Sequence, residues 1–486
     1  MKRFSVILLF FSLCMILYGC AGSPSPKDDP KGSPAEAGKA DYESVLFDTS
    51  VVHQIDIRIA EDDWNDLLAN AINKTKYHAD IEIDGEVTKD VSFAAKGNSS
   101  LFFVAAEPDS SRYSFRINFG KFTKGQTFHG LKSLSLNNSF CDATYMRDHL
   151  SYEMFRQLGV PAPLSSYVWL TVNGEDRGLY LAVEDENESF LNREYGGKGV
   201  IYKPESGDLG LTLDKIEDIK KNGLPMTADP HGSDLVYTDD DPASYPDIFD
   251  NAETDARGQD SFLVIAALRS LPEGTNLSFF LDTDEIIRFF AVHNFLLNYD
   301  SYTGAMLHNL VLVEQSGRLS LVPWDYNLTF GTFVPGAGYT VLDDATNLLN
   351  QGIDSPLIGA SEEERPMWKW ILGDDSYLNV YHEILGTLVT DYFTAGQFER
   401  DFNHVYELLL PYVRKDPTAF YSAERFRSGC DVLKQFCLRR AESVRRQLNG
   451  TLAARNEEQA DRDKVDASDL SIRDMGVFVD YNFSLN

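Results

Sequence analysis

The sequence has 486 residues, of which 43% are hydrophobic and 12% aromatic, and this is enough apolar material for a large core or for one domain made of two lobes. Its formal net charge of −31 argues against nucleic acid as a partner, because binding to a phosphate backbone requires an excess of Lys and Arg. The five cysteines are too few and too widely spaced for a disulfide framework or a zinc site.

The N-terminus has the pattern of an export signal. Lys2 and Arg3 precede an apolar run over residues 4–17, which is too short to span a membrane comfortably. The run leads into LYGC, and a small residue just before Cys20 resembles a bacterial lipoprotein signal, in which that cysteine becomes lipidated and N-terminal. A plain secretory signal and an N-terminal anchor are the alternatives, and all three predict a location outside the cytoplasm. We expect residues 1–19 to be removed and Cys20 to attach the chain to the cell envelope.

Strand patterns dominate the next part of the chain. Residues 20–44 have the Pro, Ser, Gly, Lys and Asp content of a flexible tether, and residues 45–203 are predicted to form a strand-rich lobe. Alternation of apolar and polar residues predicts strands in HQIDIRIA, YHADIEIDG, EVTKDVSFAAKGN and SRYSFRINF.

One helix and one hairpin complete this lobe. The helix is predicted for DATYMRDHLSYEMFRQLG, with Asp142 as its N-cap and Gly159 at its end. The hairpin joins SSYVWLTV to RGLYLAVE through an Asn-Gly turn at residues 173–174, a dipeptide typical of tight hairpin turns.

Residues 204–450 are predicted to form a second, mainly helical lobe. Residues 204–260 are acidic and turn-rich, so we expect a long loop or insertion there. From Asp282, DTDEIIRFFAVHNFLLNYD begins with an acidic cap and has a broad apolar face, and the strands HNLVLVEQSG and RLSLVPWD follow it. Residues 366–448 are largely amphipathic helix, and the polar residues 451–486 are expected to form a loose tail. The fold class is therefore predicted to be α+β.

Three polar residues stand out at the ends of elements in the second lobe. Asp300 ends the apolar helix, Asn309 begins a strand, and Asp325 ends the next strand in VPWDYNLTFG. Two carboxylates and an amide are suitable ligands for a hard cation such as Mg²⁺, which prefers oxygen and retains the phosphates of its substrate. The alternative is that Asp300 merely ends its helix and Asp325 caps a turn.

Basic candidates lie in the first lobe. Lys96 sits in AKGNSS, a turn whose small residues leave backbone donors free for an anion, although Lys-Gly-Asn is also ordinary turn chemistry. Arg116 alternates with apolar residues in SFRINF, and Lys203 ends the apolar strand VIYKP. Both side chains point either to solvent or into a cleft.

Several segments of the chain occur in an order that resembles a known family. In chain order they are KGNSS, SFRINF, LKSLSLNN, MRDHLSYEMFRQLGVPAP, VNGEDRGLYLAVE, IYK, NYDSY with HN, and VPWDYNLTFG. Together they resemble the CotH family, named after the bacterial spore coat protein H. The resemblance extends from Phe93 to Phe333 and continues more weakly to Leu448.

That family is similar to an atypical protein kinase. The resemblance implies a kinase-like fold of two lobes, and transfer of the γ-phosphoryl group of ATP to Ser or Thr of a protein with the help of Mg²⁺ or Mn²⁺. Within residues 298–331, Asp300 would orient the substrate hydroxyl or accept its proton. Asn309 would be a metal-binding amide, and Asp325 would match the metal-binding aspartate of the usual Asp-Phe-Gly.

The resemblance also implies ATP-binding roles for residues of the first lobe. SFRINF would stand where a kinase has its lysine strand, with Arg116 as the basic residue and Glu153 on the following helix as its ion-pair partner. Lys96 and Lys203 are the remaining basic candidates for the nucleotide.

Two of the departures from the kinase and family patterns concern the expected metal site. Asp300 and Asn309 are nine residues apart, whereas the corresponding residues of ordinary kinases are five apart. Asn327 stands where many family members have a second aspartate. This asparagine either weakens metal binding or serves as an oxygen ligand itself.

Three functions follow as hypotheses. The first is a lipid-anchored kinase that phosphorylates a protein outside the cytoplasm, where ATP is scarce. The second is a non-catalytic surface protein that uses the fold for adhesion or assembly. The third binds ATP but transfers AMP. Intact Asp300 and Asp325 favour the first hypothesis, and Asn327 favours the second.

Overall fold

The computed structural model describes most of the chain after residue 40. The described residues are 41–107, 110–206, 230–334 and 344–478, and they belong to one unit, Lys39–Asn486. The expected signal and Cys20 lie outside them, as do residues 207–229 of the acidic segment. Within the described ranges, no helix has both the length and the apolar character needed to cross a membrane.

In the described part of the chain, seven strands close into a barrel with the order β1-β2-β3-β4-β5-β7-β6. Neighbouring strands pair antiparallel, except that β1 and β6 pair in parallel and complete the ring. The strands are β1 (Val52–Ile59), β2 (Tyr77–Ile83), β3 (Glu86–Lys96), β4 (Ser114–Asn118), β5 (Ser133–Asn137), β6 (Ser165–Val172) and β7 (Glu175–Glu184). All strands predicted from alternation are therefore confirmed.

The predicted hairpin is confirmed between β6 and β7. Asn173 and Gly174 both have positive φ, 52° and 80°, as a two-residue turn that matches the strand twist requires. Asn173 also accepts a hydrogen bond from the backbone N–H of Ile59 at 2.9 Å, so the turn is tied to β1.

A second sheet joins residues from both predicted lobes. In the described chain it has three strands in the order β10-β9-β8, namely β8 (Val200–Tyr202), β9 (Leu310–Gln315) and β10 (Arg318–Pro323). Its pairings are antiparallel, for example Ile201 with Val313 and Leu321 with Leu312. The end of the strand-rich segment is therefore paired into the second half of the chain.

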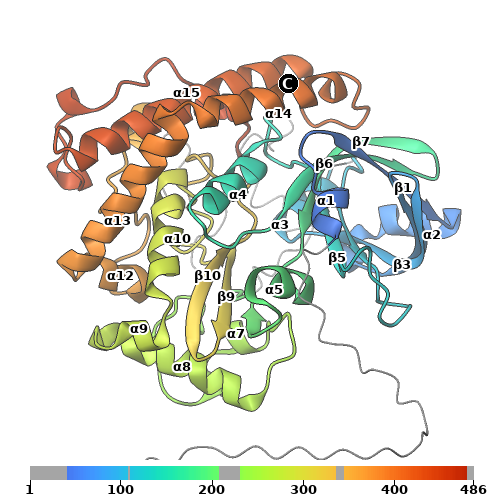
Figure 1. The fold of residues 1–486 in the computed structure, drawn as a ribbon. Helices are drawn as coiled ribbons and strands as arrows, with labels where there is room; N and C mark the ends of the chain where they lie inside the picture. The colour runs from blue at the N-terminus through green and yellow to red at the C-terminus, as the bar shows by residue number, and fades with distance from the viewer. Residues whose placement is uncertain (1–40, 108–109, 207–229, 335–343, 479–486) are drawn as a thin grey trace, which may run out of the picture. The chain divides into compact units, whose positions relative to one another are not determined.

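The helices occur mostly in the second half of the chain (Figure 1). Together with the strands they give the predicted α+β class. The α-helices are α1 (Tyr42–Leu46), α2 (Glu61–Ala69), α3 (Ser99–Ala105), α4 (Arg147–Gln157), α5 (Glu188–Tyr195), α7 (Pro246–Phe249), α8 (Gly258–Glu273), α9 (Leu277–Phe280), α10 (Thr283–Leu296), α11 (Ala345–Leu349), α12 (Pro366–Leu372), α13 (Asp375–Thr387), α14 (Gln397–Val413) and α15 (Ala423–Leu448). Short 3₁₀ turns lie at Ala71–Asn73, Pro242–Ser244, Asn456–Glu458, Asp461–Asp463 and Ile472–Met475, and a π-helix at Leu388–Thr394.

Helix α10 forms the centre of the helical half. Ten of its fourteen residues are buried, so the helix is enclosed on nearly all sides. The Asp282 carboxylate accepts a hydrogen bond from the Glu285 backbone, which confirms the predicted acidic cap. Figure 1 shows α4 between α10 and the barrel. Helix α4 contacts both α10 and the barrel strand β6.

Three predictions about helices need correction. Helix α4 begins at Arg147 rather than after Asp142, because the Asp142 carboxylate accepts hydrogen bonds from the Thr144 and Arg147 backbones in a turn before the helix. Helix α8 begins inside the segment expected to be loop. Helices α2 and α3 were not predicted, since α2 buries only Trp64 and Leu67 and so lacks a clear apolar stripe.

The expected loose tail is wrong for its described part. Val465, Ile472, Met475 and Val477 are all buried, the last three completely. The Met475 carbonyl accepts a hydrogen bond from the Ala143 backbone, so the tail packs against the turn that leads into α4. These few apolar side chains are enough to hold the segment against the rest of the fold.

Candidate functional site

The loop after α10 brings Asp300 and Asn309 together. The helix ends at Leu296, and its cap Leu297 has a positive φ of 53° that turns the chain away from the helix axis. Asp300 lies in this loop, and Asn309 directly precedes β9 with a φ of 56°. The Asn309 amide donates a hydrogen bond to Asp300 Oδ2 at 2.8 Å, despite the spacing of nine residues.

The turn after β10 places Asp325 beside this pair. Asp325 also has a positive φ, 53°, a conformation that short polar side chains tolerate. Its backbone N–H donates to the Tyr152 hydroxyl of α4 at 3.0 Å. Burial, followed by the negative charge of Asp325, raises the pKa of the Asp300 carboxyl well above its ordinary value. The two carboxylates therefore repel each other.

Asp148 is an acid of the site that the sequence analysis did not single out. It is buried on α4, and it accepts hydrogen bonds from the Tyr326 backbone at 2.8 Å and from the Asn137 amide at 3.1 Å. Burial, followed by the charge of Asp325, raises the pKa of Asp148 to about 7. The signal available in the sequence was weak: an aspartate in the first turn of a helix is ordinary dipole chemistry.

Glu153, the acid predicted on this helix, has a different partner. It lies five residues after Asp148, which places it about 140° around an α-helix. Glu153 accepts a hydrogen bond from Arg156 on the same helix at 2.6 Å. The expected ion pair between Glu153 and Arg116 is therefore not formed, because the helix presents Asp148 to the site instead.

The basic candidate Arg116 pairs with an aspartate that follows β7. Arg116 Nε donates to Asp185 Oδ2 at 2.9 Å, and Asp185 also accepts hydrogen bonds from Ser133 and Ser135 at 2.5 Å each. Burial alone would raise the pKa of Asp185, but the charge of Arg116 and the two hydroxyl donors hold it below its ordinary value. Asp185 thus fixes the side chain of Arg116 on β4.

Two lysines meet at Trp324. The ammonium group of Lys203 lies 3.8 Å from the centre of the Trp324 ring, and that of Lys96 lies 5.2 Å from it. Lys96 also donates a hydrogen bond to Asn137 Oδ1 at 2.9 Å. Desolvation lowers the pKa of Lys96, while Asp325 and Asp185 oppose this shift. Two cations therefore face the residue that immediately precedes Asp325.

The donor chemistry of the site fits a hard cation bound together with phosphates. Among the described residues no group of three or more His, Cys, Asp or Glu is placed to hold a metal ion. Mg²⁺ commonly takes one or two carboxylates and completes its shell with water and phosphate. Asn309 uses its amide nitrogen for Asp300, which leaves its carbonyl oxygen for another partner. Asn327 lies two residues beyond Asp325 in the same loop and is partly exposed.

One buried acid in this region has an unsatisfied atom. Glu186, next to Asp185, is 4% exposed, and its Oε1 has no hydrogen-bond partner within the described part of the chain. Burial raises its pKa well above the ordinary value, an effect that the charge of Lys203 opposes. This oxygen is available to a ligand, a water molecule or an ion.

Lys96 and Arg116 of the barrel, with Lys203 directly after β8 of the second sheet, thus supply cations, and the loops of the helical half supply carboxylates and an amide. This arrangement is suited to binding phosphates and a metal. The chain matches the family described as CotH kinase protein over residues 93–444, and it belongs to that family. The match contains every residue of the site described above.

Two relatives from Bacillus subtilis (strain 168) are similar to this chain. The inner spore coat protein H is 23% identical over 402 residues, which cover 82% of this chain and 96% of the relative. An inner spore coat protein H-like protein is 36% identical over 106 residues, which cover 22% of this chain and 33% of that protein. The predicted family is confirmed.

Proposed function

We propose that this protein is a CotH-like kinase that transfers the γ-phosphoryl group of ATP to Ser or Thr of a protein substrate. The observation that supports this most is the meeting of Asp300 and Asp325 with Lys96 and Lys203 around one turn. On this proposal the barrel and the helical half are the two lobes of a kinase-like fold, and ATP binds between their charged groups.

Asp300 acts on the substrate hydroxyl. It accepts a hydrogen bond from that hydroxyl and takes its proton as the oxygen bonds to the γ-phosphorus. The bond between this phosphorus and the bridging oxygen breaks, and ADP leaves. The hydrogen bond from Asn309 fixes the Asp300 carboxyl for this task. Phosphoryl transfer requires mainly positioning and charge stabilisation, so few groups suffice.

The phosphates are neutralised by basic side chains and a metal ion. Lys96, at the end of the barrel strand β3, and Lys203, directly after β8 of the second sheet, bind phosphate oxygens, and Arg116, held by Asp185, adds a third positive charge nearby. Asp325, with Asn309 and Asn327, would hold Mg²⁺ or Mn²⁺. When bound, the metal ion stabilises the negative charge that develops on the transferred group.

We also propose that the protein acts outside the cytoplasm, attached to the cell envelope through a lipid on Cys20. The export pattern of the first twenty residues supports this location. The relative that is covered over 96% of its length is called an inner spore coat protein. The protein substrate would then be another exported protein.

The test uses the protein from Lys39 onward, incubated with Mg²⁺ or Mn²⁺ and ATP labelled at the γ- or the α-phosphate. Transfer of γ-label alone, lost in Asp325→Ala, supports the kinase. Transfer of α-label would assign AMP transfer instead. If calorimetry detects no nucleotide binding, both reactions are excluded and the non-catalytic surface protein remains.

A further inference from the structure

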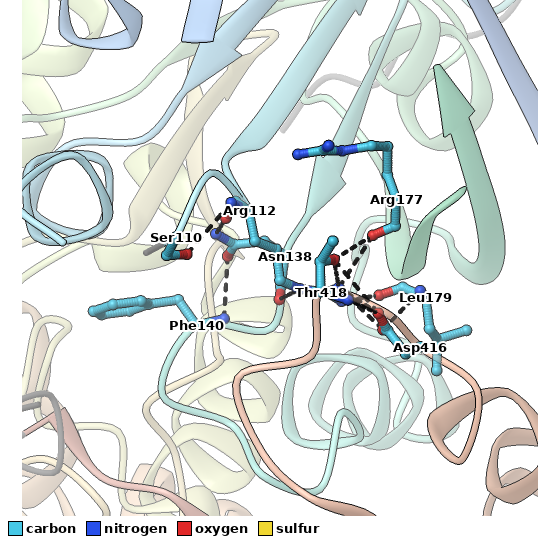
Figure 2. A network of polar contacts seen from close by, with 8 residues as sticks. All are labelled: Ser110, Arg112, Asn138, Phe140, Arg177, Leu179, Asp416 and Thr418. Carbon is cyan, nitrogen blue, oxygen red and sulfur yellow. Dashed lines mark hydrogen bonds and ion pairs between the residues drawn. The ribbon is translucent and has the colours of Figure 1, made fainter. Parts of the chain in front are cut away.

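A buried ion pair joins the barrel to the helical half. Arg112 lies just before β4, and Asp416 lies 304 residues later in the connection between α14 and α15. Arg112 Nη1 is 3.0 Å from Asp416 Oδ2, and the two side chains are 1% and 0% exposed. Figure 2 shows the pair at the centre of a polar network.

The side chain of Asp416 is hydrogen-bonded to the backbone of β7. Its Oδ2 accepts a hydrogen bond from the Leu179 backbone at 2.9 Å. Gly178 leaves the necessary room, since a Cβ atom there would lie 1.9 Å from Asp416 Oδ1. Thr418 donates to the Arg177 carbonyl at 2.5 Å, so the loop is held at two points (Figure 2). The connection between α14 and α15 is thereby fixed to the barrel.

Arg112 in turn fixes the backbone at Asn138, directly after β5. Arg112 Nε donates to the Asn138 carbonyl at 3.0 Å, and the Asn138 side chain returns a hydrogen bond to the Arg112 carbonyl at 2.6 Å. The Asn138 backbone N–H donates to Ser114 Oγ at 3.1 Å. Asn138 is therefore restrained from three directions.

The neighbouring Asn137 belongs to the candidate site. Its Oδ1 accepts from Lys96 at 2.9 Å, and its amide nitrogen donates to Asp148 at 3.1 Å. Asp148 accepts from the Tyr326 backbone next to Asp325. A shift of the backbone at Asn138 would therefore move the side-chain amide of Asn137. This amide bridges Lys96, a proposed phosphate ligand, and Asp148, which lies beside the turn at Asp325.

We propose that Arg112 and Asp416 are positioning residues for phosphoryl transfer: by clamping Asn138 they hold Asn137 between Lys96 and Asp148. The inference rests on the function proposed for this site. A planar guanidinium donates to several acceptors at fixed angles, whereas an ammonium group does not. Arg112→Lys therefore keeps a positive charge beside Asp416 but loses the simultaneous contacts to Asn138 and Leu179.

The test compares Arg112→Lys and Asp416→Asn with Arg177→Lys in the protein from Lys39 onward. Arg177 is a matched control, because its side chain points away from the network in Figure 2 and donates to Ser111 instead. Circular dichroism first establishes that each variant is folded at the assay temperature. The kcat for γ-phosphoryl transfer should fall about 10- to 100-fold in the two clamp variants, as for a misplaced catalytic group, and should stay at the wild-type value in the control.

A second measurement does not depend on catalysis. The rate at which a lysine-acylating reagent modifies Lys96, followed by mass spectrometry without nucleotide, should rise in both clamp variants and stay constant in the control. If Asp416→Asn does not fold, Arg112→Lys alone decides the result. Unchanged Lys96 labelling in a folded clamp variant would overturn the inference even if transfer falls, because the fall would then not come from a displacement of Lys96. If the wild type transfers no phosphate, the proposed function fails, while a faster labelling still establishes the clamp.

Discussion

At the scale of single residues, the main property of the site is its concentration of like charge: the carboxyl groups of Asp300 and Asp325, which are partly exposed, lie near that of Asp148, which is buried. Burial, followed by the charge of Asp325, raises the pKa values of both other acids. Such repulsion destabilises the fold and is typical of functional sites, where a ligand supplies the missing positive charge.

Replacing Asp325 should therefore separate stability from activity. In Asp325→Asn, γ-phosphoryl transfer should fall by about 100-fold or more, because a charged group at the phosphates is lost. The repulsion on Asp300 and Asp148 is relieved, while the attraction to Lys96 is lost. We expect the relief at two acids to outweigh the loss at one lysine, so the free energy of unfolding should rise by about 1 kcal/mol. Urea denaturation measures the second effect, with the exposed Asp391→Asn as control. A loss of stability in Asp325→Asn would contradict this account.

His293 predicts a dependence of stability on pH. It is fully buried on α10, between the hydroxyl groups of Tyr326 and Thr303 at 2.8 Å each, and burial lowers its pKa from 6.5 to about 3. The folded protein thus resists protonation that the unfolded chain accepts. The contribution of neutral His293 to the free energy of unfolding is therefore complete above pH 6.5. It is lost as the pH falls toward 3, by up to about 1.4 kcal/mol per pH unit. Urea denaturation at several pH values should show a shallower slope for His293→Gln.

At the scale of elements, the orientation of α4 decides which acid reaches the site. Its sequence contains Asp148 and Glu153, and either could face a basic strand residue when the sequence is considered alone. The helix packs between the barrel and α10, and this packing directs Asp148 to the turn at Asp325. The choice depends on the rotation of the helix about its axis, which no local pattern specifies.

The turn between β6 and β7 allows a test of local backbone strain. Gly174 has a φ of 80°, and a Cβ atom there would meet nothing within 4 Å. Gly174→Ala should therefore cost about 1 kcal/mol of unfolding free energy through the backbone alone. Gly258→Ala is the matched control: this position is equally open, but its φ is not positive, so stability should be unchanged or slightly higher. Equal effects at the two positions would contradict the explanation.

At the scale of the whole molecule, the described residues form two apolar clusters. One fills the barrel and includes Phe93, Phe115 and Ile117, and the other lies among the helices and includes Phe289 and Trp368. The polar site lies where residues from the two halves meet, and the pair formed by Arg112 and Asp416 fixes one half to the other. Relative movement of the halves would change the distance between cations and carboxylates.

The C-terminal segment should contribute to the stability of the whole protein. Ile472 is completely buried, although its segment is polar in composition. Ile472→Ala should lower the free energy of unfolding by about 2–4 kcal/mol, whereas the exposed Ser468→Ala should have little effect. Thermal or urea denaturation measures both. If Ile472→Ala left stability unchanged, the segment would be dispensable for folding.

Much of the secondary structure followed from the sequence, because its signals are local. Alternation marked the barrel strands β1 to β4, an Asn-Gly pair marked the hairpin of β6 and β7, and an acidic cap marked the start of α10, whereas β5 was not predicted. Asp300, Asn309 and Asp325 were recognised because each stands close to the end of an apolar element, where a polar residue is conspicuous, although Asp300 lies in the loop after α10 rather than at its last residue. The family was recognised for a related reason, since its motifs are short, local and fixed in order.

Only the tertiary structure decided which charged and polar side chains pair with one another. Arg116 pairs with Asp185, Asn137 bridges Lys96 and Asp148, and Asp416 reaches Arg112 across 304 residues. Each of these contacts depends on the closure of the barrel and on its packing against the helices, which bring together side chains far apart in the chain. Alternation and capping describe neighbours within a few residues. Whether two distant charges meet is decided only by the complete fold.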